Sequence, residues 1–284
     1  MGMVEGSAQN IRTRRLAMDY ASLYWTFIRI NIKAKTEYRA AFLLTFLSRG
    51  IVWSTEFALI WVLLYKFQSI AGWGQYEVMF LYALNLTSYS LAAFFCFHPF
   101  TKLPAKIQSG EFDELLTKPM NPLLYLMSRE FTASYFSNVA FGMLFIGICI
   151  SQLKLSLSAW DFFFLFITLV GGTLIQAAAF IYTAIPSFWM VRNTSIAQLL
   201  LFDFKDFIRY PVSIYPASIQ IVLTLIVPYA FINFYPAQYF LGKQDFLMFH
   251  PLFQYLTLAV GSVLFAGALL LWNWGIKQYH STGS

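Results

Sequence analysis

Long apolar runs that contain no charged residue limit this chain more than any other feature of its sequence. These runs cover residues 78–97, 131–153, 162–191, 210–242 and 246–276. Each is long enough for a transmembrane helix, because about 20 helical residues cross the hydrocarbon core of a bilayer. The chain is only 11% charged, whereas a soluble domain carries about 25% charged residues. We therefore predict an integral membrane protein.

The apolar runs favour helices over the strands of a membrane barrel. Barrel strands alternate between lipid-facing and lumen-facing side chains over about 10 residues, and the run FFFLFITLV at residues 162–170 shows no alternation. The predicted fold is an all-α membrane protein with six transmembrane helices, at about 41–65, 78–97, 131–153, 162–190, 217–236 and 253–276. In the fifth span, Pro228 is expected to kink the helix and Pro236 to end it. Together the spans form one membrane domain over residues 41–277.

Lysine and arginine residues predict how the spans are oriented. If the N-terminus is cytoplasmic, fifteen of these residues fall in cytoplasmic segments, and three, Lys66, Lys154 and Lys243, fall outside. Both termini are therefore predicted to be cytoplasmic, because positive charge collects on that side of a membrane. The net charge of +6 then reflects topology and contact with anionic membrane lipid, with no indication of nucleic-acid binding.

The sequence before the first span divides into a tail and an interfacial helix. Residues 1–19 lack the apolar core of a signal peptide and are predicted to be a cytoplasmic tail, as are residues 278–284. Residues 20–40 mix aromatic residues such as Trp25 with basic residues such as Arg29. This mixture is typical of an amphipathic helix at the membrane surface. The alternative is a polar extension of the first span.

Some polar residues lie inside the spans, where they are candidates for function. Arg49 and Glu56 are seven positions apart, roughly on one face of a helix, and such charges usually face a cavity or a protein interior. Arg49 is also close enough to the end of its span to reach lipid head groups. Arg209, before the fifth span, is a further structural or functional charge. The candidates for a translocation path are Glu56, Asn85, Ser88, Asn138 and Gln176, although such groups more often form hydrogen bonds between packed helices.

The patterns of an enzyme are missing from the sequence. His98, His250 and His280 are scattered, and no metal-ligand spacing appears. Cys96 and Cys149 fall near opposite ends of neighbouring spans, so no disulfide is expected. There is no G-x-x-x-x-G-K-[ST] phosphate loop. We expect a chain with no catalytic residue, no metal and no directly bound cofactor, so that another chain would hydrolyse any ATP that is used.

One short charged segment interrupts the apolar runs: residues 106–122 read KIQSGEFDELLTKPMNP. Ser109 or Gly110 is predicted to begin a short helix with acidic residues in its first turn, and Pro119 to stop it. The predicted helix places an acidic face and exposed leucines in a basic cytoplasmic environment. That combination favours a cytosolic protein partner over lipid. The residues expected to make this contact are Glu111, Phe112, Asp113, Glu114, Leu115 and Leu116.

This segment resembles the cytoplasmic coupling segment of six-span, exporter-type ABC permeases (the type 2 superfamily), in the viologen-exporter or multidrug branch. Two other stretches resemble the same branch: residues 188–216, FWMVRNTSIAQLLLFDFKDFIRYPVSIYP, and residues 227–239, VPYAFINFYPAQY. The resemblance covers roughly residues 20–277. The first 18 residues depart from the pattern.

The resemblance implies a permease subunit of an ATP-driven pump in a bacterial inner membrane. Such a pump has two permease chains, identical or paralogous, and two separate ATP-binding subunits that carry ATP and Mg. Residues 111–116 would be the coupling helix on which the ATPase docks. The cargo would be an amphipathic or hydrophobic drug, lipid or glycoconjugate.

Three other functions stay open at this point. An ion-coupled secondary transporter would usually show internal repeats and intramembrane ionisable groups; here only Arg49 and Glu56 are present. A membrane-embedded lipid-modifying enzyme would offer a cluster of His, Asp and Glu residues on one face. A membrane scaffold without transport is the third.

Overall fold

The computed structural model describes residues 22, 24–33, 39–190 and 203–280, and this part of the chain is almost entirely helical. Five helices are long and apolar enough to cross a membrane, and one bent pair of shorter helices would make a sixth. The five are α2 (Arg39–Phe67), α3 (Gln75–Thr101) with α4 (Leu103–Gln108), α7 (Tyr135–Gln152), α8 (Ala159–Ala184) with the 3-10 turn η1 (Ile185–Phe188), and α13 (Thr257–Gln278). The predicted all-α membrane fold is confirmed.

The remaining elements are short and lie between the long helices. They are β1 (Ser69–Ile70) and β2 (Trp73–Gly74), α5 (Glu111–Leu116), α6 (Pro122–Arg129), α10 (Phe204–Phe207), η3 (Val212–Ile214), α11 (Ala217–Ile221), η4 (Val222–Ile226), η5 (Tyr229–Phe231), α12 (Phe234–Leu241) and η6 (Pro251–Tyr255). β1 and β2 pair antiparallel as a small hairpin.

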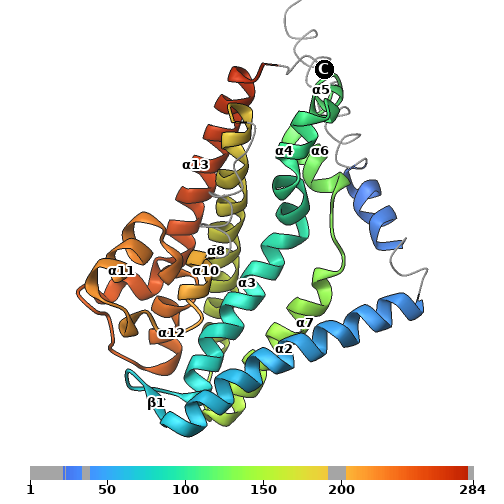
Figure 1. Cartoon of the computed structure of the whole chain (residues 1–284). Helices are drawn as coiled ribbons and strands as arrows, with labels where there is room; N and C mark the ends of the chain where they lie inside the picture. Colours follow the sequence, from blue (N-terminus) through green and yellow to red (C-terminus); the bar gives the residue numbers. More distant parts are fainter. Residues whose placement is uncertain (1–21, 23, 34–38, 191–202, 281–284) are drawn as a thin grey trace, which may run out of the picture.

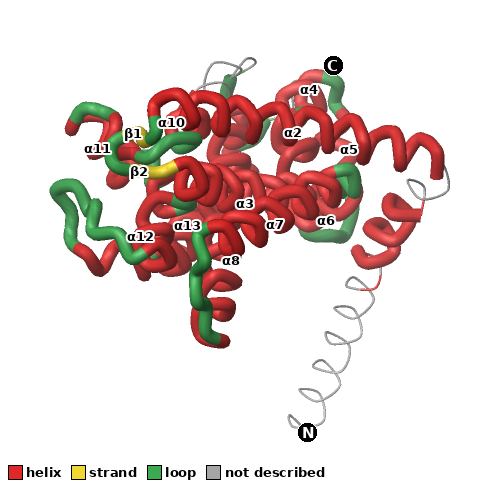
Figure 2. Tube along the Cα trace, turned by 90° about the horizontal axis from the view of Figure 1, so that it is seen from below, coloured by secondary structure: helices red, strands yellow, loops and turns green. Residues whose placement is uncertain are grey.

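The long helices run between two ends of an elongated bundle (Figure 1). We call them the hairpin end, which holds β1 and β2, and the α5 end, which holds α4, α5 and α6. α3, α8 and α13 run from the hairpin end to the α5 end, whereas α2 and α7 run the opposite way. Viewed along the bundle, the segments around α11 and α12 lie on one side and the helix over residues 24–33 on the other (Figure 2).

Two neighbouring helices differ sharply in burial. Of an 18-residue apolar stretch within α3 and α4, 83% is buried, because α7, α8 and α2 all pack around α3. Of the corresponding apolar stretch of α2, only 22% is buried, and large side chains such as Leu44, Ile51 and Val62 project outward. Apolar residues exposed along a whole helix suit a lipid-facing position, where no aqueous penalty applies. α3 is therefore the core of the bundle, and α2 is a peripheral helix.

α8 and α13 pack with their backbones in contact. A Cβ atom on Gly171 of α8 would lie 2.7 Å from the backbone nitrogen of Leu258, and one on Gly261 of α13 would collide with the carbonyl oxygen of Gly171. Only glycine permits this approach, which is typical of helix pairs in membranes. Nearer the α5 end, the Tyr182 hydroxyl donates to the Leu264 carbonyl at 3.0 Å. The two helices therefore form one tightly joined pair.

Residues 217–236, the predicted fifth span, fall in a helix pair that is sharply bent. α11 with η4 and η5 with α12 make two limbs bent by 77°. The break falls at Val227 and Pro228, so the predicted kink at Pro228 is confirmed. Pro236 does not end the helix as predicted, because α12 continues to Leu241. A proline in the first turn of a helix removes only an N–H that has no intrahelical partner there.

The second limb of the bent pair lies at the hairpin end. The Phe231 carbonyl accepts a hydrogen bond of 2.8 Å from Thr257 Oγ1, at the start of α13. Asn233 Nδ2 donates to the carbonyls of Leu81 and Ile208, at 3.1 and 2.7 Å. Figure 1 shows the first limb, labelled α11, in the same half of the molecule. Both limbs therefore occupy one half of the bundle.

The described residues on either side of positions 191–202 lie in different halves of the bundle. Phe188, at the end of η1, packs on Phe112 of α5, with ring centroids 5.6 Å apart. Ile208 already lies beside Leu81, in the hairpin half of α3. The chain therefore changes ends between Phe188 and Ile208, a stretch that includes residues 191–202, which lie outside the described part. We had assigned this stretch to a cytoplasmic loop.

The predicted interfacial helix is present, over residues 24–33. It packs against α6: the Phe27 and Tyr125 rings meet edge to face at 5.6 Å, and Asn31 Nδ2 donates to the Arg129 carbonyl at 3.2 Å. Trp25 and Ile30 stay exposed. The helix therefore belongs to the α5 end of the bundle, with an apolar surface still uncovered. The predicted tail at residues 1–19 lies outside the described residues, and of the predicted tail at residues 278–284 only residues 278–280 are described.

Candidate functional site

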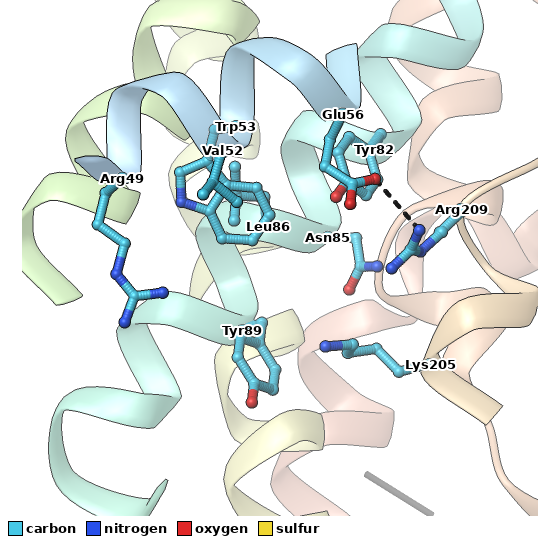
Figure 3. Close-up of a pocket in the computed structure, with 10 residues that line it drawn as sticks. All are labelled: Arg49, Val52, Trp53, Glu56, Tyr82, Asn85, Leu86, Tyr89, Lys205 and Arg209. Carbon is cyan, nitrogen blue, oxygen red and sulfur yellow. Dashed lines mark hydrogen bonds and ion pairs between the residues drawn. The ribbon is translucent and has the colours of Figure 1, made fainter. Parts of the chain in front are cut away.

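A polar pocket lies between α2, α3 and the segment around α10 (Figure 3). Its volume is about 150 Å³. α3 turns one helical face toward it, since Tyr82, Asn85 and Tyr89 follow at intervals of three and four residues. Among the described residues, its lining consists of Arg49, Val52, Trp53, Glu56, Tyr82, Asn85, Leu86, Tyr89, Lys205 and Arg209. Two of the predicted path residues, Glu56 and Asn85, thus meet both predicted charges, Arg49 and Arg209.

An ion pair joins α2 to the segment after α10. Arg209 Nη1 lies 3.2 Å from Glu56 Oε2, and Arg209 Nε lies 3.1 Å from Asp206 Oδ1. The side chains of Arg209 and Glu56 retain 35% and 33% of their exposed area. The pair is therefore half-buried and reachable from outside. A charge at the centre of a bilayer costs about 3 kcal/mol on insertion scales, so pairing here offsets part of a real penalty.

Two cations of the pocket lie against aromatic rings. The Lys205 ammonium is 4.1 Å from the centre of the Tyr89 ring, and the Arg209 guanidinium is 5.9 Å from that of Tyr82. Such contacts contribute about 0.5–2 kcal/mol each, depending on desolvation. In Figure 3, Arg49 and Lys205 approach from opposite sides of Tyr89. Within the described ranges Arg49 has no hydrogen-bond or ion-pair partner.

The charges that line the pocket do not balance. Within the described lining, Arg49, Lys205 and Arg209 bring three positive charges, and Glu56 brings one negative charge. Asp206 also contacts Arg209 but is half-exposed and lies outside the lining. The pocket thus carries an excess of positive charge among aromatic walls, which is the electrostatic environment of an anion site.

The other predicted path residues are held in contacts between helices. Gln176 Nε2 of α8 donates to Asn85 Oδ1 at 3.2 Å, and Trp53 Nε1 of α2 donates to Asn138 Oδ1 of α7 at 2.9 Å. Ser88 is fully buried against Gly172, and its hydroxyl has no hydrogen-bond partner in the part of the chain that the structure describes. Gln176 and Asn138 therefore fit the packing role that we had left as the alternative.

Lys205, Tyr82 and Tyr89 belong to the site, but we did not predict them from the sequence. Lys205 was assigned to a cytoplasmic loop, and aromatic residues within a span carried no distinguishing signal. Tyr82 and Tyr89 lie on the same helical face as Asn85, which we did predict. That spacing could have indicated both tyrosines.

The short helix predicted in residues 106–122 is present as α5, at the α5 end of the bundle, and Gly110 is its N-cap. Gly110 has φ +73°, a left-handed conformation that glycine adopts without strain. Phe112 and Leu115 are buried, which corrects the prediction that these residues are exposed to a partner. The Phe112 ring contacts Phe188 and Tyr279, with centroids 5.6 and 5.2 Å away. These contacts hold α5 against the ends of α8 and α13.

The acidic residues of α5 are partly neutralised within the chain. Lys106, itself buried, lies 2.7 Å from both Glu111 and Glu130. Arg129 is a further 3.6 Å from Glu111. The hydrogen bond from Lys106 lowers the pKa of Glu111, partly opposed by desolvation and assisted by the nearby positive charges. Lys106, Glu111, Arg129 and Glu130, which we call the Lys106 cluster, join α4, α5 and α6.

A smaller surface of α5 stays accessible. Glu114 is 69% exposed and forms an i, i+4 ion pair of 3.2 Å with Lys118. Ser109, Thr117 and Pro119 are exposed around it. Asp113 and Leu116 are half-buried. The surface available for a partner therefore centres on Glu114 and the turn that follows it.

No group of three or more His, Cys, Asp and Glu residues within the described ranges could hold a metal ion. Cys96 and Cys149 are both buried and free, as predicted.

Comparison with known proteins gives one match. A family model described as ABC-2 family transporter protein matches residues 50–283. No curated protein and no solved structure matches significantly. The matched range covers most of the chain. It includes α4, α5 and α6 and every described pocket residue except Arg49.

Proposed function

Because the chain belongs to the ABC-2 transporter family, we propose that it is the permease subunit of an ATP-driven exporter. It would form a pump with two ATP-binding subunits, which carry ATP and Mg, and with a second permease chain, identical or paralogous. The cargo would be an amphipathic or hydrophobic molecule, such as a drug, a lipid or a glycoconjugate. Membership of this family implies an ATP-binding partner, and that observation carries the proposal.

The α5 end is the surface that we propose for the ATPase. It gathers α4, α5, α6 and the helix over residues 24–33 at one end of the bundle. Exposed Glu114 gives it a docking group, and buried Phe112 links it to the ends of α8 and α13. A push on α5 would therefore reach two long helices directly. On this proposal the α5 end faces the cytoplasm of a bacterium, both termini lie there, and the hairpin end faces outward.

Co-purification tests the proposal. The chain is co-expressed with each candidate ATP-binding subunit encoded next to it, and the purified complex is assayed for ATPase activity in proteoliposomes. We expect a stable complex. Its ATPase activity in proteoliposomes should differ from that of the ATP-binding subunit alone. If no ATP-binding subunit co-purifies, the proposed pump is wrong, and a scaffold or an ion-coupled transporter gains support.

The docking surface can be tested separately by charge reversal. Glu114→Lys should weaken binding of the ATPase by about tenfold or more, because a charged contact across an interface typically contributes about 1.5 kcal/mol or more. Lys66→Glu, a charge reversal on an exposed residue at the hairpin end, is the matched control and should leave binding unchanged. Equal binding by the Glu114→Lys variant would remove α5 from the interface.

Orientation can be measured with thiol labels. Both native cysteines are buried, so a cysteine introduced at an exposed position should dominate labelling. Thr117→Cys is expected to react only when the cytoplasmic face is accessible, and Lys66→Cys only from outside. The reverse pattern would invert the proposed topology.

A further inference from the structure

We propose that the pocket between α2, α3 and α10 binds the anionic group of an amphipathic molecule, whether phosphate, sulfonate or carboxylate. The inference rests on the proposed function, because it names the chemical class of the cargo. It is carried by the charges, walls and size of the pocket.

The charges of the pocket favour the binding of an anion. Three cations, Arg49, Lys205 and Arg209, and one carboxylate, Glu56, belong to its described lining. Asp206, just outside that lining, also pairs with Arg209, so three cations face two carboxylates. They come from separate segments, α2 on one side and the region around α10 on the other, so an anion between them would be held from two sides (Figure 3). Excess positive charge that serves packing alone is costly within a membrane domain, which favours a ligand that neutralises it.

Glu56 behaves as an internal competitor for the ligand. Its carboxylate lies 3.2 Å from Arg209, in the position that the oxygen of a bound anion would take. Both side chains keep about a third of their exposed area, 33% and 35%. An incoming anionic group can therefore replace Glu56 at Arg209 without entering a closed core. Removal of the Glu56 carboxylate should strengthen binding, which structural damage alone would not do.

The size and walls of the pocket identify an amphiphile. Its volume of about 150 Å³ is enough for a phosphate or sulfonate group but too little for a long alkyl chain. Val52 and Trp53 of α2 line it, and Val52 is half-exposed at the outer surface of the bundle. From there, exposed apolar residues of α2 such as Ile51 continue outward. A tail would leave the pocket beside Val52 and lie along α2.

The test is equilibrium binding to the purified permease in nanodiscs of neutral phosphatidylcholine, without any ATPase. The probes are decyl phosphate, decyl trimethylammonium, decyl maltoside and inorganic phosphate, measured by calorimetry. We expect decyl phosphate to bind at least tenfold more tightly than the cationic and neutral amphiphiles. We also expect its affinity to fall as salt is raised, because exposed ion pairing is screened.

Variants locate the binding. Arg209→Gln and Lys205→Gln should each lower the affinity for decyl phosphate by about tenfold. Glu56→Gln should raise that affinity several-fold, and Lys66→Gln should leave it unchanged. Because Arg209→Gln leaves Glu56 unpaired, the double variant Glu56→Gln with Arg209→Gln is included, and it should bind as weakly as Arg209→Gln while folding normally.

Three results would overturn the inference. Equal affinity for decyl trimethylammonium would exclude an anion site, and an unchanged affinity in Glu56→Gln would exclude Glu56 as a competitor. Inorganic phosphate binding as tightly as decyl phosphate would assign the pocket to a free anion instead of an amphiphile. Because no ATPase is present, these results are independent of whether an ATP-binding subunit co-purifies.

Discussion

Around α5, Lys106 is shared between Glu111 and Glu130 at 2.7 Å each, whereas in the pocket beside α2 three cations surround one carboxylate. The first arrangement satisfies its charges inside the chain and fixes α4, α5 and α6 to one another. The second has more cations than carboxylates in its described lining and keeps its Glu56–Arg209 pair partly exposed. On the proposal above, the difference separates a cluster that stabilises the fold from a pocket that accepts a ligand. The predictions below test that separation from the largest expected effect to the smallest.

Phe112→Ala should destabilise the permease by about 3–4 kcal/mol, because removing a fully buried Phe side chain leaves a cavity. The ring is buried against Phe188 and Tyr279. The measurement is the free energy of unfolding in detergent. Leu124→Ala, on the exposed side of α6, should change it by less than about 0.5 kcal/mol. If Phe112→Ala is equally mild, Phe112 faces a partner after all, and the α5 region is not self-contained.

Lys106→Met should destabilise the permease by about 2–3 kcal/mol, because it leaves Glu111 and Glu130 without their closest cation. Breaking a buried ion pair costs about 3–5 kcal/mol, and the partial exposure of both carboxylates reduces that cost. The control is Lys102→Met, whose side chain is 57% exposed and lies 4.0 Å from Glu130. Equal unfolding free energies for the two variants would show that the Lys106 cluster contributes no more than a surface pair.

The Glu56–Arg209 pair should couple more weakly, by about 0.5–1 kcal/mol, because both groups are about a third exposed and solvent screens them. The measurement is a double-mutant cycle of Glu56→Gln and Arg209→Gln on the free energy of unfolding. A coupling as large as the loss in Lys106→Met would make the pocket a structural cluster like the one at α5. The proposed contrast between the two regions would then fail.

Acidification should lower the free energy of unfolding of the wild-type permease slightly. It should lower that of the Lys106→Met variant less. Because hydrogen bonding to Lys106 lowers the pKa of Glu111 in the folded chain, the unfolded chain takes up a proton first as pH falls. The stability from Glu111 is therefore present above the unfolded pKa of about 4.3 and is lost as pH falls through the lowered folded value. We expect the free energies of unfolding of wild type and Lys106→Met, plotted against pH, to converge below about pH 4. A constant difference between them at all pH values would rule out this linkage.

Much of the fold follows from local sequence, and the site follows only in part. Uncharged runs predict long helices because each helix satisfies its own backbone in lipid, and Gly110 and Pro119 bracket α5 as expected. Burial of Phe112 was not predictable, since it depends on the ends of α8 and α13, more than 70 residues away along the chain. Lys205 and Arg209 were misplaced because charge counts treat every basic residue between spans as a loop residue. Here both enter the bundle, where Glu56 and Tyr89 compensate them.

The family was also predictable from the segment GEFDELLTKP, and the match over residues 50–283 confirms it. Equal hydropathy could not distinguish α2 from α3, because lipid and protein interior are equally apolar. Only packing shows that α3 is central and α2 is peripheral.

The glycine contact between α8 and α13 has a mechanical consequence for the bundle. Gly171 lies 17 residues before Phe188 (188 − 171), about 26 Å at the rise of an α-helix. The backbones of the two helices are in close contact at Gly171 and Gly261. If an ATPase docks on α5 as proposed, a force on Phe112 would act on the helix pair at about that distance from its closest contact.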